Sequence, residues 1–150
     1  MVKMKKLTLI IVLLCQLLTV GCTKQPINSE VEGFWMLKSF VTLSDGKTHQ
    51  CERLYYSITR MVTEVAEKEG ELGLTACVAR TGYNEDQSQL LLTDFKVRRS
   101  TSDSKKDATI EDLNPYGINN QELTVFDIIY CNGKVMTLQS DYARLELERF

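Results

Sequence analysis

Apolar residues recur at every second position in several segments after residue 33, which is the period of a β-strand with one buried face. The first segment is predicted to place the following residues on one face: Trp35, Leu37, Ser39, Val41 and Leu43. An Asp-Gly turn at residues 44–47 follows and favours a hairpin. Alternation resumes at residues 72–78 and 90–97, on either side of a polar turn at residues 84–87. These segments predict a mainly β protein.

The C-terminal third of the chain carries the clearest hairpin signal. Residues 122–130 and 134–139 flank an Asn-Gly pair, and Asn-Gly between apolar segments is the strongest short-range signal for a hairpin. In the final strand, Leu145 and Leu147 are predicted to face inward and the charged residues between them to face solvent.

Residues 54–69 fit two secondary structures. Their apolar positions match a helical spacing, and residues 64–69 have a composition suited to a helix. The segment is nevertheless rich in tyrosine, isoleucine, valine and threonine, which favour strands. The strand interpretation is therefore favoured.

Residues 100–120 predict a mobile loop that contains one short helical turn. Its first half, residues 100–107, offers no apolar side chain whose burial would offset the entropy cost of about 1–2 kcal/mol per ordered residue. Asp107 is the candidate helix cap, and Pro115 is expected to stop any helix. The second half is expected to pack against the domain through three apolar side chains: Ile110, Leu113 and Tyr116.

The N-terminus has the pattern of an export signal. Three lysines within the first six residues precede an apolar run over residues 7–20, and no acidic residue occurs before Glu30. The run is shorter than the roughly 20 apolar residues of a membrane-spanning helix. It ends in Leu18-Thr19-Val20-Gly21-Cys22, which resembles the bacterial lipobox, where a peptidase cleaves before a cysteine that carries diacylglycerol. The alternative is a secretory signal that is cut elsewhere.

The lipobox resemblance implies a signal peptide at residues 1–21, a lipidated Cys22, a tether over residues 22–30 and a folded domain over residues 31–150. Acyl chains hold such a protein at a membrane, so we expect it in the bacterial cell envelope, at the outer membrane. Removal of residues 1–21 takes away three lysines and no acidic residue, which changes the net charge from −2 to −5. Attachment is therefore expected from the lipid and not from a basic patch. Fully extended, residues 23–30 would reach about 26 Å and hold the domain clear of the bilayer.

Seven or eight antiparallel strands joined by short turns favour closure into a barrel, because closure removes unpaired strand edges. Gly33-Phe34-Trp35 resembles the G-x-W motif of lipocalins. The chain after residue 30 is similar to the lipocalin-like domains of small bacterial cell-envelope lipoproteins, with residues 113–118 before a strand and a matching end over residues 138–150. This resemblance implies an antiparallel up-and-down β-barrel with one short helical turn, in which Trp35 plugs the barrel floor. It implies no catalytic residue.

Composition narrows the function. The chain is 43% apolar and 25% charged, as in a single globular domain. Its near-neutral charge lacks the basic face that nucleic acid would require. His49 is the single histidine, and no ligand cluster with metal-binding spacing is present, so we expect neither a metal nor a cofactor.

Two residue pairs have the spacing of catalytic groups. His49 and Cys51 would share a strand face, as a Cys-His nucleophile requires, but no third orienting group is evident. Glu146 and Glu148 would lie about 7 Å apart, near the separation of an inverting glycosidase pair, but their charged flanks favour a solvated face. We expect no catalytic residue and no enzyme activity.

Three charged residues lie in otherwise apolar or small-residue segments: Arg60, Arg80 and Asp127. At inward positions they would need partners or would orient a ligand. Outward or barrel-end placement is favoured.

Three cysteines remain beside Cys22 in the exported chain. Cys51 and Cys131 are expected at one barrel rim, where a disulfide would join them, and Cys77 is expected to be a buried thiol. The alternative is that all three are reduced.

Two functions follow. The leading hypothesis is a barrel that binds a small apolar or amphipathic ligand in its mouth. The alternative is a protein-interaction module whose barrel is filled by its own side chains. The bulky residues that would fill it are Trp35, Tyr55, Tyr56, Phe95, Phe126 and Tyr130.

Overall fold

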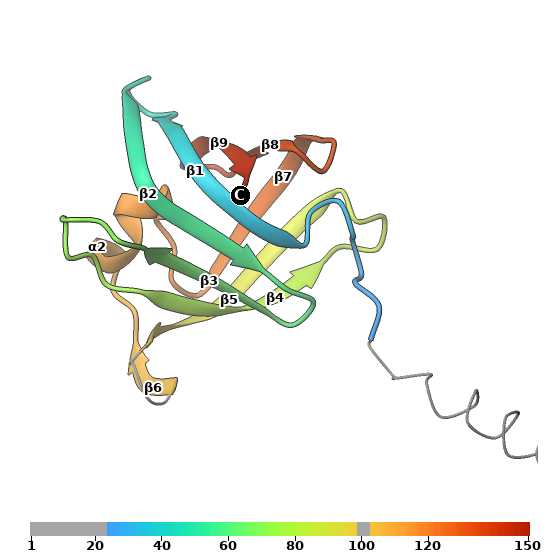
Figure 1. Cartoon of the computed structure of the whole chain (residues 1–150), viewed down its shortest axis with the longest axis horizontal. Helices are drawn as coiled ribbons and strands as arrows, with labels where there is room; N and C mark the ends of the chain where they lie inside the picture. Colours follow the sequence, from blue (N-terminus) through green and yellow to red (C-terminus); the bar gives the residue numbers. More distant parts are fainter. Residues whose placement is uncertain (1–23, 99–102) are drawn as a thin grey trace, which may run out of the picture.

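The computed structural model describes residues 24–98 and 103–150 (Figure 1). Its strands are β1 (Gly33–Thr42), β2 (Thr48–Ile58), β3 (Val62–Glu67), β4 (Cys77–Tyr83), β5 (Gln89–Arg98), β6 (Asp103–Asp107), β7 (Leu123–Cys131), β8 (Val135–Gln139) and β9 (Ala143–Arg149). A short helix, α2 (Ile110–Leu113), continues into the 3₁₀ helix η1 (Asn114–Tyr116). No helix in these two ranges is long and apolar enough to span a membrane.

Eight of the nine strands close into a barrel. Antiparallel pairs join them in the order β4-β3-β2-β1-β9-β8-β7-β5, and a further pairing of β4 with β5 completes the ring. Barrel strands that follow one another along the chain are also neighbours in the sheet. This is the predicted up-and-down barrel. β6 pairs with the C-terminal part of β5 and lies outside the ring.

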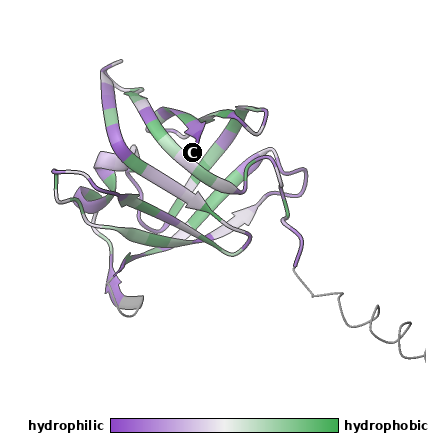
Figure 2. Ribbon diagram, viewed as in Figure 1, coloured by the Kyte–Doolittle hydropathy of each residue, from purple (hydrophilic) through white to green (hydrophobic). Residues whose placement is uncertain are grey.

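The barrel interior is filled by large side chains. In Figure 2 most apolar residues lie on the strands, whereas β6 is polar. The largest fully buried side chains are aromatic: Trp35, Tyr56, Tyr116, Phe95 and Phe126. Of the six bulky residues expected to fill the barrel, four are buried; Tyr55 and Tyr130 face outward, and Tyr130 is 51% exposed.

The two barrel ends differ. At the end that we call the helical end, α2 and η1 lie beside the β1–β2, β3–β4 and β8–β9 turns. At the opposite end, called the Trp35 end, residues 24–32 lead into β1 (Figure 1). Trp35 is fully buried there, its Nε1 donates a 2.7 Å hydrogen bond to the Val31 carbonyl, and the Arg149 guanidinium lies 4.6 Å from its ring centre. This burial fits the expected plug.

A β-bulge changes the predicted inward face of β1. Register shifts between Leu37 and Ser39 on both sides of β1. Against β9, β1 carries one extra residue, which is the bulge and which reverses the face of the residues that follow. Phe40 and Thr42 are buried as a result, and Leu43 is 43% exposed. The predicted alternation was therefore correct through Leu37 and wrong beyond it.

The strand expected at residues 72–78 begins only at Cys77, and its buried face carries Cys77 and Ala79 in place of the even-numbered residues. The residues before it form a loop whose amides are bound by a side chain and not by a neighbouring strand. By contrast, residues 54–69 form the favoured strands, and both Asp-Gly and Asn-Gly turns are present, with Gly46 and Gly133 at positive φ.

Residues 103–120 contain more regular secondary structure than predicted. Residues 103–107 form β6, and the helix cap is Thr109 and not Asp107, because Thr109 and Asp112 form a reciprocal capping box. Leu113 and Tyr116 are fully buried as expected, but Ile110 is 39% exposed. Residues 100–102 lie outside the described residues.

Arg60, Arg80 and Asp127 lie at outward or barrel-end positions, as the sequence favoured. Arg80 is 78% exposed beside Asp94, and Asp127 accepts a hydrogen bond from Gln89 on the outer surface. Arg60 lies in the β2–β3 turn at the Trp35 end. Glu146 and Glu148 are exposed on β9.

Candidate functional site

An open pocket of about 630 Å³ lies at the helical end of the barrel. Residues from β1, β2, the β3–β4 loop, α2, η1 and the β8–β9 turn form its walls. Its lining residues are Phe40, His49, Gln50, Cys51, Glu52, Leu54, Leu72, Leu74, Glu111, Asn114, Pro115 and Tyr142. Its volume falls within the range of about 300–1,000 Å³ that is usual for small-molecule sites.

The floor of the pocket is apolar and buried. Phe40 and Leu54 are 4% and 3% exposed and belong to the core of the barrel. Phe40 points here because of the bulge in β1, so the feature that breaks the predicted alternation also shapes the pocket.

The β3–β4 loop is held over the pocket by one carboxylate. Glu67, at the end of β3, accepts hydrogen bonds from the backbone amides of Leu72 and Leu74 at 2.8 and 2.9 Å. These backbone hydrogen bonds lower the pKa of Glu67 below its ordinary value. Glu67 therefore positions Leu72 and Leu74, which line the pocket.

α2 and η1 form one wall of the pocket, and two tyrosine hydroxyl groups and a helix capping box hold this wall in place. The Tyr56 hydroxyl donates a 2.6 Å hydrogen bond to the Tyr116 carbonyl, and the Tyr116 hydroxyl donates one of 3.0 Å to the Thr75 carbonyl. The first bond joins β2 to η1, and the second joins η1 to the β3–β4 loop. The capping box of Thr109 and Asp112 secures the start of α2, and its backbone hydrogen bond lowers the pKa of Asp112.

The polar side of the pocket carries His49 and Cys51, which share one face of β2 as predicted. The His49 ring stacks on Phe40 with centres 4.4 Å apart, and its Nε2 lies 3.0 Å from the Thr42 hydroxyl. Burial raises the pKa of Cys51 to about 11. A thiol with such a pKa carries almost no thiolate at neutral pH, so the raised pKa does not favour Cys51 as a nucleophile.

Two features of the pocket bear on its ligand. Asn114 lines it, and the Asn114 Oδ1 atom is buried without a hydrogen-bond partner. Among the described residues, the charged groups in the lining are Glu52 and Glu111, with no lysine or arginine. The arrangement suits an apolar group on the floor and a neutral or cationic group at the rim.

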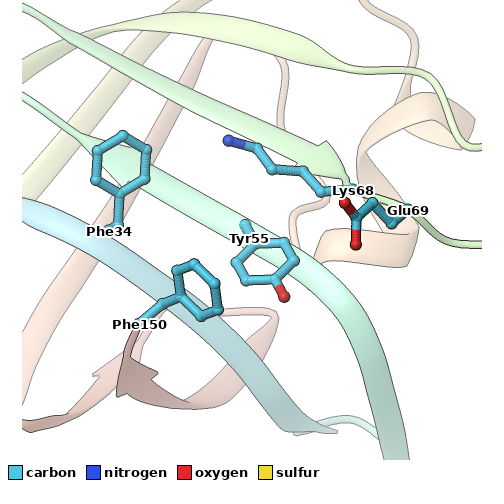
Figure 3. Close-up of a pocket in the computed structure, with 5 residues that line it drawn as sticks. All are labelled: Phe34, Tyr55, Lys68, Glu69 and Phe150. Carbon is cyan, nitrogen blue, oxygen red and sulfur yellow. The ribbon is translucent and has the colours of Figure 1, made fainter.

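A second pocket, of about 500 Å³, lies on the outer surface of β1 and β2 (Figure 3). The rings of Phe34, Tyr55 and Phe150 gather there, with Tyr55 and Phe150 edge to face at 5.3 Å between centres. The Lys68 ammonium is directed at the Phe34 ring, 5.2 Å from its centre. Phe34 and Phe150 are 51% and 80% exposed.

Cys51, Cys77 and Cys131 are free thiols, so the expected disulfide between Cys51 and Cys131 is wrong, and so is their expected placement at one rim of the barrel. Cys51 borders the pocket at the helical end, whereas the Cys131 thiol lies 3.4 Å from the Glu30 carbonyl at the Trp35 end. In sheet order β2 and β7 are separated by β1, β9 and β8. Cys77 is buried, as predicted. Cys22 lies outside the described residues.

Sequence reasoning identified His49 and Cys51 as sharing one face, but it missed the loop and helix that complete the pocket. Glu67 and Leu74 carried no motif, and Asn114 was part of the resemblance over residues 113–118 with no role in a pocket, because these roles depend on contacts between segments far apart in the chain. Within the described ranges, no group of histidine, cysteine and acidic side chains is placed to hold a metal ion.

Comparison with known proteins agrees with the fold. The family described as lipocalin-like domain matches residues 16–150. A lipocalin-like protein from Bacteroides uniformis superposes with a TM-score of 0.58 at 12% identity, covering 81% of this chain and 99% of that one. An uncharacterized protein from Bacteroides eggerthii gives a TM-score of 0.55 at 16% identity, covering 79% and 98%. No curated protein matches the sequence. The closed eight-stranded barrel and the match over nearly the whole chain show that this protein belongs to the lipocalin-like domain family.

Proposed function

We propose that this protein is a lipid-anchored protein of the bacterial envelope that binds a small amphipathic molecule at the helical end of its barrel. The pocket of about 630 Å³ carries the binding proposal, because it joins an apolar floor to a polar rim. The ligand we favour is neutral or cationic, since acidic residues are the charged groups in the lining. The filled interior supports a ligand at the barrel mouth over one along the barrel axis.

The anchor is supported by the sequence. Residues 18–22 resemble a lipobox, and the preceding apolar run has the length of a signal peptide. Replacing Cys22 with alanine and fractionating cells tests it: the variant should leave the membrane fraction and change its mobility. Unchanged membrane association would contradict lipidation.

Mass spectrometry of small molecules retained by the purified protein tests the pocket. Leu72 lines it and is 69% exposed, so Leu72→Lys should preserve the fold while placing a positive charge beside a ligand that we expect to be neutral or cationic. We expect the retained molecule to fall about tenfold, which corresponds to a loss of about 1.4 kcal/mol in binding free energy. Leu123→Lys is the matched control, since Leu123 is 46% exposed on β7 and lies outside this pocket. Equal retention by the two variants would contradict the assignment.

A protein-interaction role is the second candidate, and the outer aromatic pocket is the observation that favours it. Exposed apolar groups of this kind often mark contact surfaces, and the filled interior agrees with a barrel that acts through its outside. A photoreactive residue at Phe34 should then form a defined protein adduct in cells, whereas one at Leu123 should not. Absence of an adduct from both positions would argue for the ligand-binding role.

A further inference from the structure

We propose that the anchor holds the Trp35 end of the barrel against the bilayer, with the β2–β3 turn around Met61 in contact with lipid. The inference rests on the proposed lipidation of Cys22. It goes beyond that proposal by assigning which face of the barrel meets the membrane.

The first argument is that residues 25–32 are fastened to the barrel. The Arg60 side chain donates a 2.6 Å hydrogen bond to the Gln25 carbonyl. The Arg149 guanidinium donates to the carbonyls of Glu30 and Glu32 at 2.9 and 3.2 Å. Residue 25 is therefore already placed at the surface of the barrel.

The segment also folds on itself before it enters β1. The Glu32 carboxylate accepts hydrogen bonds from the amides of Ile27 and Asn28 at 2.7 and 3.0 Å. The Asn28 side chain accepts from the amide of Val31 at 3.3 Å. A compact turn thus replaces the extended spacer that the sequence suggested.

The second argument is the length of chain that remains for a spacer. From Cys22 to Gln25 there are three steps between Cα atoms, which span at most about 11 Å. That is less than half of the 26 Å expected for an extended tether. A lipid on Cys22 would leave the barrel no room to stand clear of the headgroups.

The third argument is the surface next to the fastening point. Met61 in the β2–β3 turn and Val62, the first residue of β3, follow Arg60 and are 65% and 45% exposed. Ile27 is 38% exposed. Figure 1 shows this turn at the same end of the barrel as the departing N-terminal segment. Burying such side chains in an apolar phase is favourable by about 25 cal/mol per Å², and the Arg60 guanidinium suits lipid phosphates.

The turn is held rigidly enough to present these side chains. The Thr59 hydroxyl donates to the Val62 carbonyl at 2.7 Å, and the amide of Thr81 donates to the Met61 carbonyl at 2.9 Å. With the Trp35 end on the membrane, the helical end faces away from it. The ligand pocket would then open to the aqueous side.

The test uses the full-length lipidated protein, reconstituted into vesicles of phosphatidylethanolamine and phosphatidylglycerol, with benzophenone-alanine in place of Met61. Leu72, which is 69% exposed at the helical end, is the matched position. We expect about tenfold more phospholipid adduct by mass spectrometry at position 61 than at position 72, since the probe reacts only with groups that it touches. Equal adducts at the two positions, or more at position 72, would overturn the inference.

A second comparison tests the fastening. Arg60→Ala removes the donor to the Gln25 carbonyl and should lower the adduct at position 61 several-fold. Arg80→Ala changes an arginine that is 78% exposed on the barrel wall and should leave the adduct unchanged. An adduct insensitive to Arg60→Ala would overturn the role of the fastened segment.

Failure of the anchor is distinguishable from failure of the orientation. If the Cys22→Ala protein floats with vesicles as well as the unsubstituted protein does, the lipid anchor is wrong. The proposed orientation of the Trp35 end toward the bilayer is then wrong as well. If only the parent floats but position 61 gains no excess adduct, the anchor stands and the orientation is wrong.

Discussion

The hydroxyl of Tyr56 and the carbonyl of Tyr116 are joined by a 2.6 Å hydrogen bond that ties the barrel wall to the helical cap. Both residues are fully buried, and burial raises the pKa of Tyr56 well above its ordinary value, so this hydroxyl stays protonated as a donor. The bond spans 60 residues of sequence and fixes where the wall of the pocket stands.

Tyr56→Phe should therefore destabilise the domain. Removing the donor leaves the Tyr116 carbonyl buried without this partner, which costs about 1–3 kcal/mol. Urea unfolding followed by the fluorescence of the single tryptophan would measure the loss. Tyr55→Phe is the control, since Tyr55 faces the outer pocket, and it should change stability by less than about 0.5 kcal/mol. Equal effects of the two changes would contradict the role of the bond.

Glu67→Gln should weaken ligand binding more than it weakens the fold. A neutral amide is a poorer acceptor for the amides of Leu72 and Leu74, so the loop over the pocket would loosen. We expect faster hydrogen exchange at these two amides, with the barrel strands unchanged. Glu71→Gln, in the same loop and exposed, is the control. Unaltered exchange at both amides would show that Glu67 does not hold the loop.

The same carboxylate predicts a pH dependence. Because the pKa of Glu67 is lowered in the folded protein, its contribution to loop stability is fully present above its ordinary value of 4.5 and is lost as the pH falls through the lowered value. Exchange at Leu72 and Leu74, corrected for intrinsic rates, should accelerate in that acidic window. In Glu67→Gln this pH dependence should vanish; if it persists, another group is responsible.

Cys51, which is partly buried, and Cys77, which is fully buried, should react slowly with alkylating reagents. Partial burial raises the pKa of Cys51 from its ordinary value of 9.0 to about 11, which lowers its thiolate fraction about a hundredfold at pH 8. Burial raises that of Cys77 to about 12. Iodoacetamide should modify the native protein slowly, and urea without a reductant should expose Cys51, Cys77 and Cys131 to full labelling. Labelling of only one of them before reduction would reveal a disulfide.

Limited proteolysis should begin near β6. This strand lies outside the closed barrel, and Lys105 and Lys106 are exposed there. Trypsin should cut first after one of these lysines, because a protease requires a locally opened chain. A first cut within the β7–β8 hairpin would mean that the barrel is less stable than its outer strand.

Much of the fold follows from alternation and turn chemistry, since Asp-Gly and Asn-Gly turns and period-two segments are local signals. The bulge after Leu37 has no such signal, because it is set by pairing with two neighbouring strands at once. That single shift moved Phe40 inward and created part of the pocket floor.

The site was less predictable for a related reason. His49 and Cys51 are two residues apart and could be placed on one face from sequence. Their neighbours Leu74, Asn114 and Tyr142 come from three distant segments that meet only after the barrel closes. The β3–β4 loop was mistaken for a strand because its apolar residues alternate, yet Glu67 captures the amides that a neighbouring strand would have bound.

The pairing of β6 with β5 alone has a consequence for association between molecules. Each strand of the barrel has a neighbour on both sides, whereas β6 has one among the described strands. Its outer backbone edge is thus a template on which a strand of another molecule could be added. Five residues is a short template, and the two adjacent positive charges of Lys105 and Lys106 repel a second copy of the same strand. The molecule therefore limits its tendency to aggregate at the one strand that barrel closure does not protect.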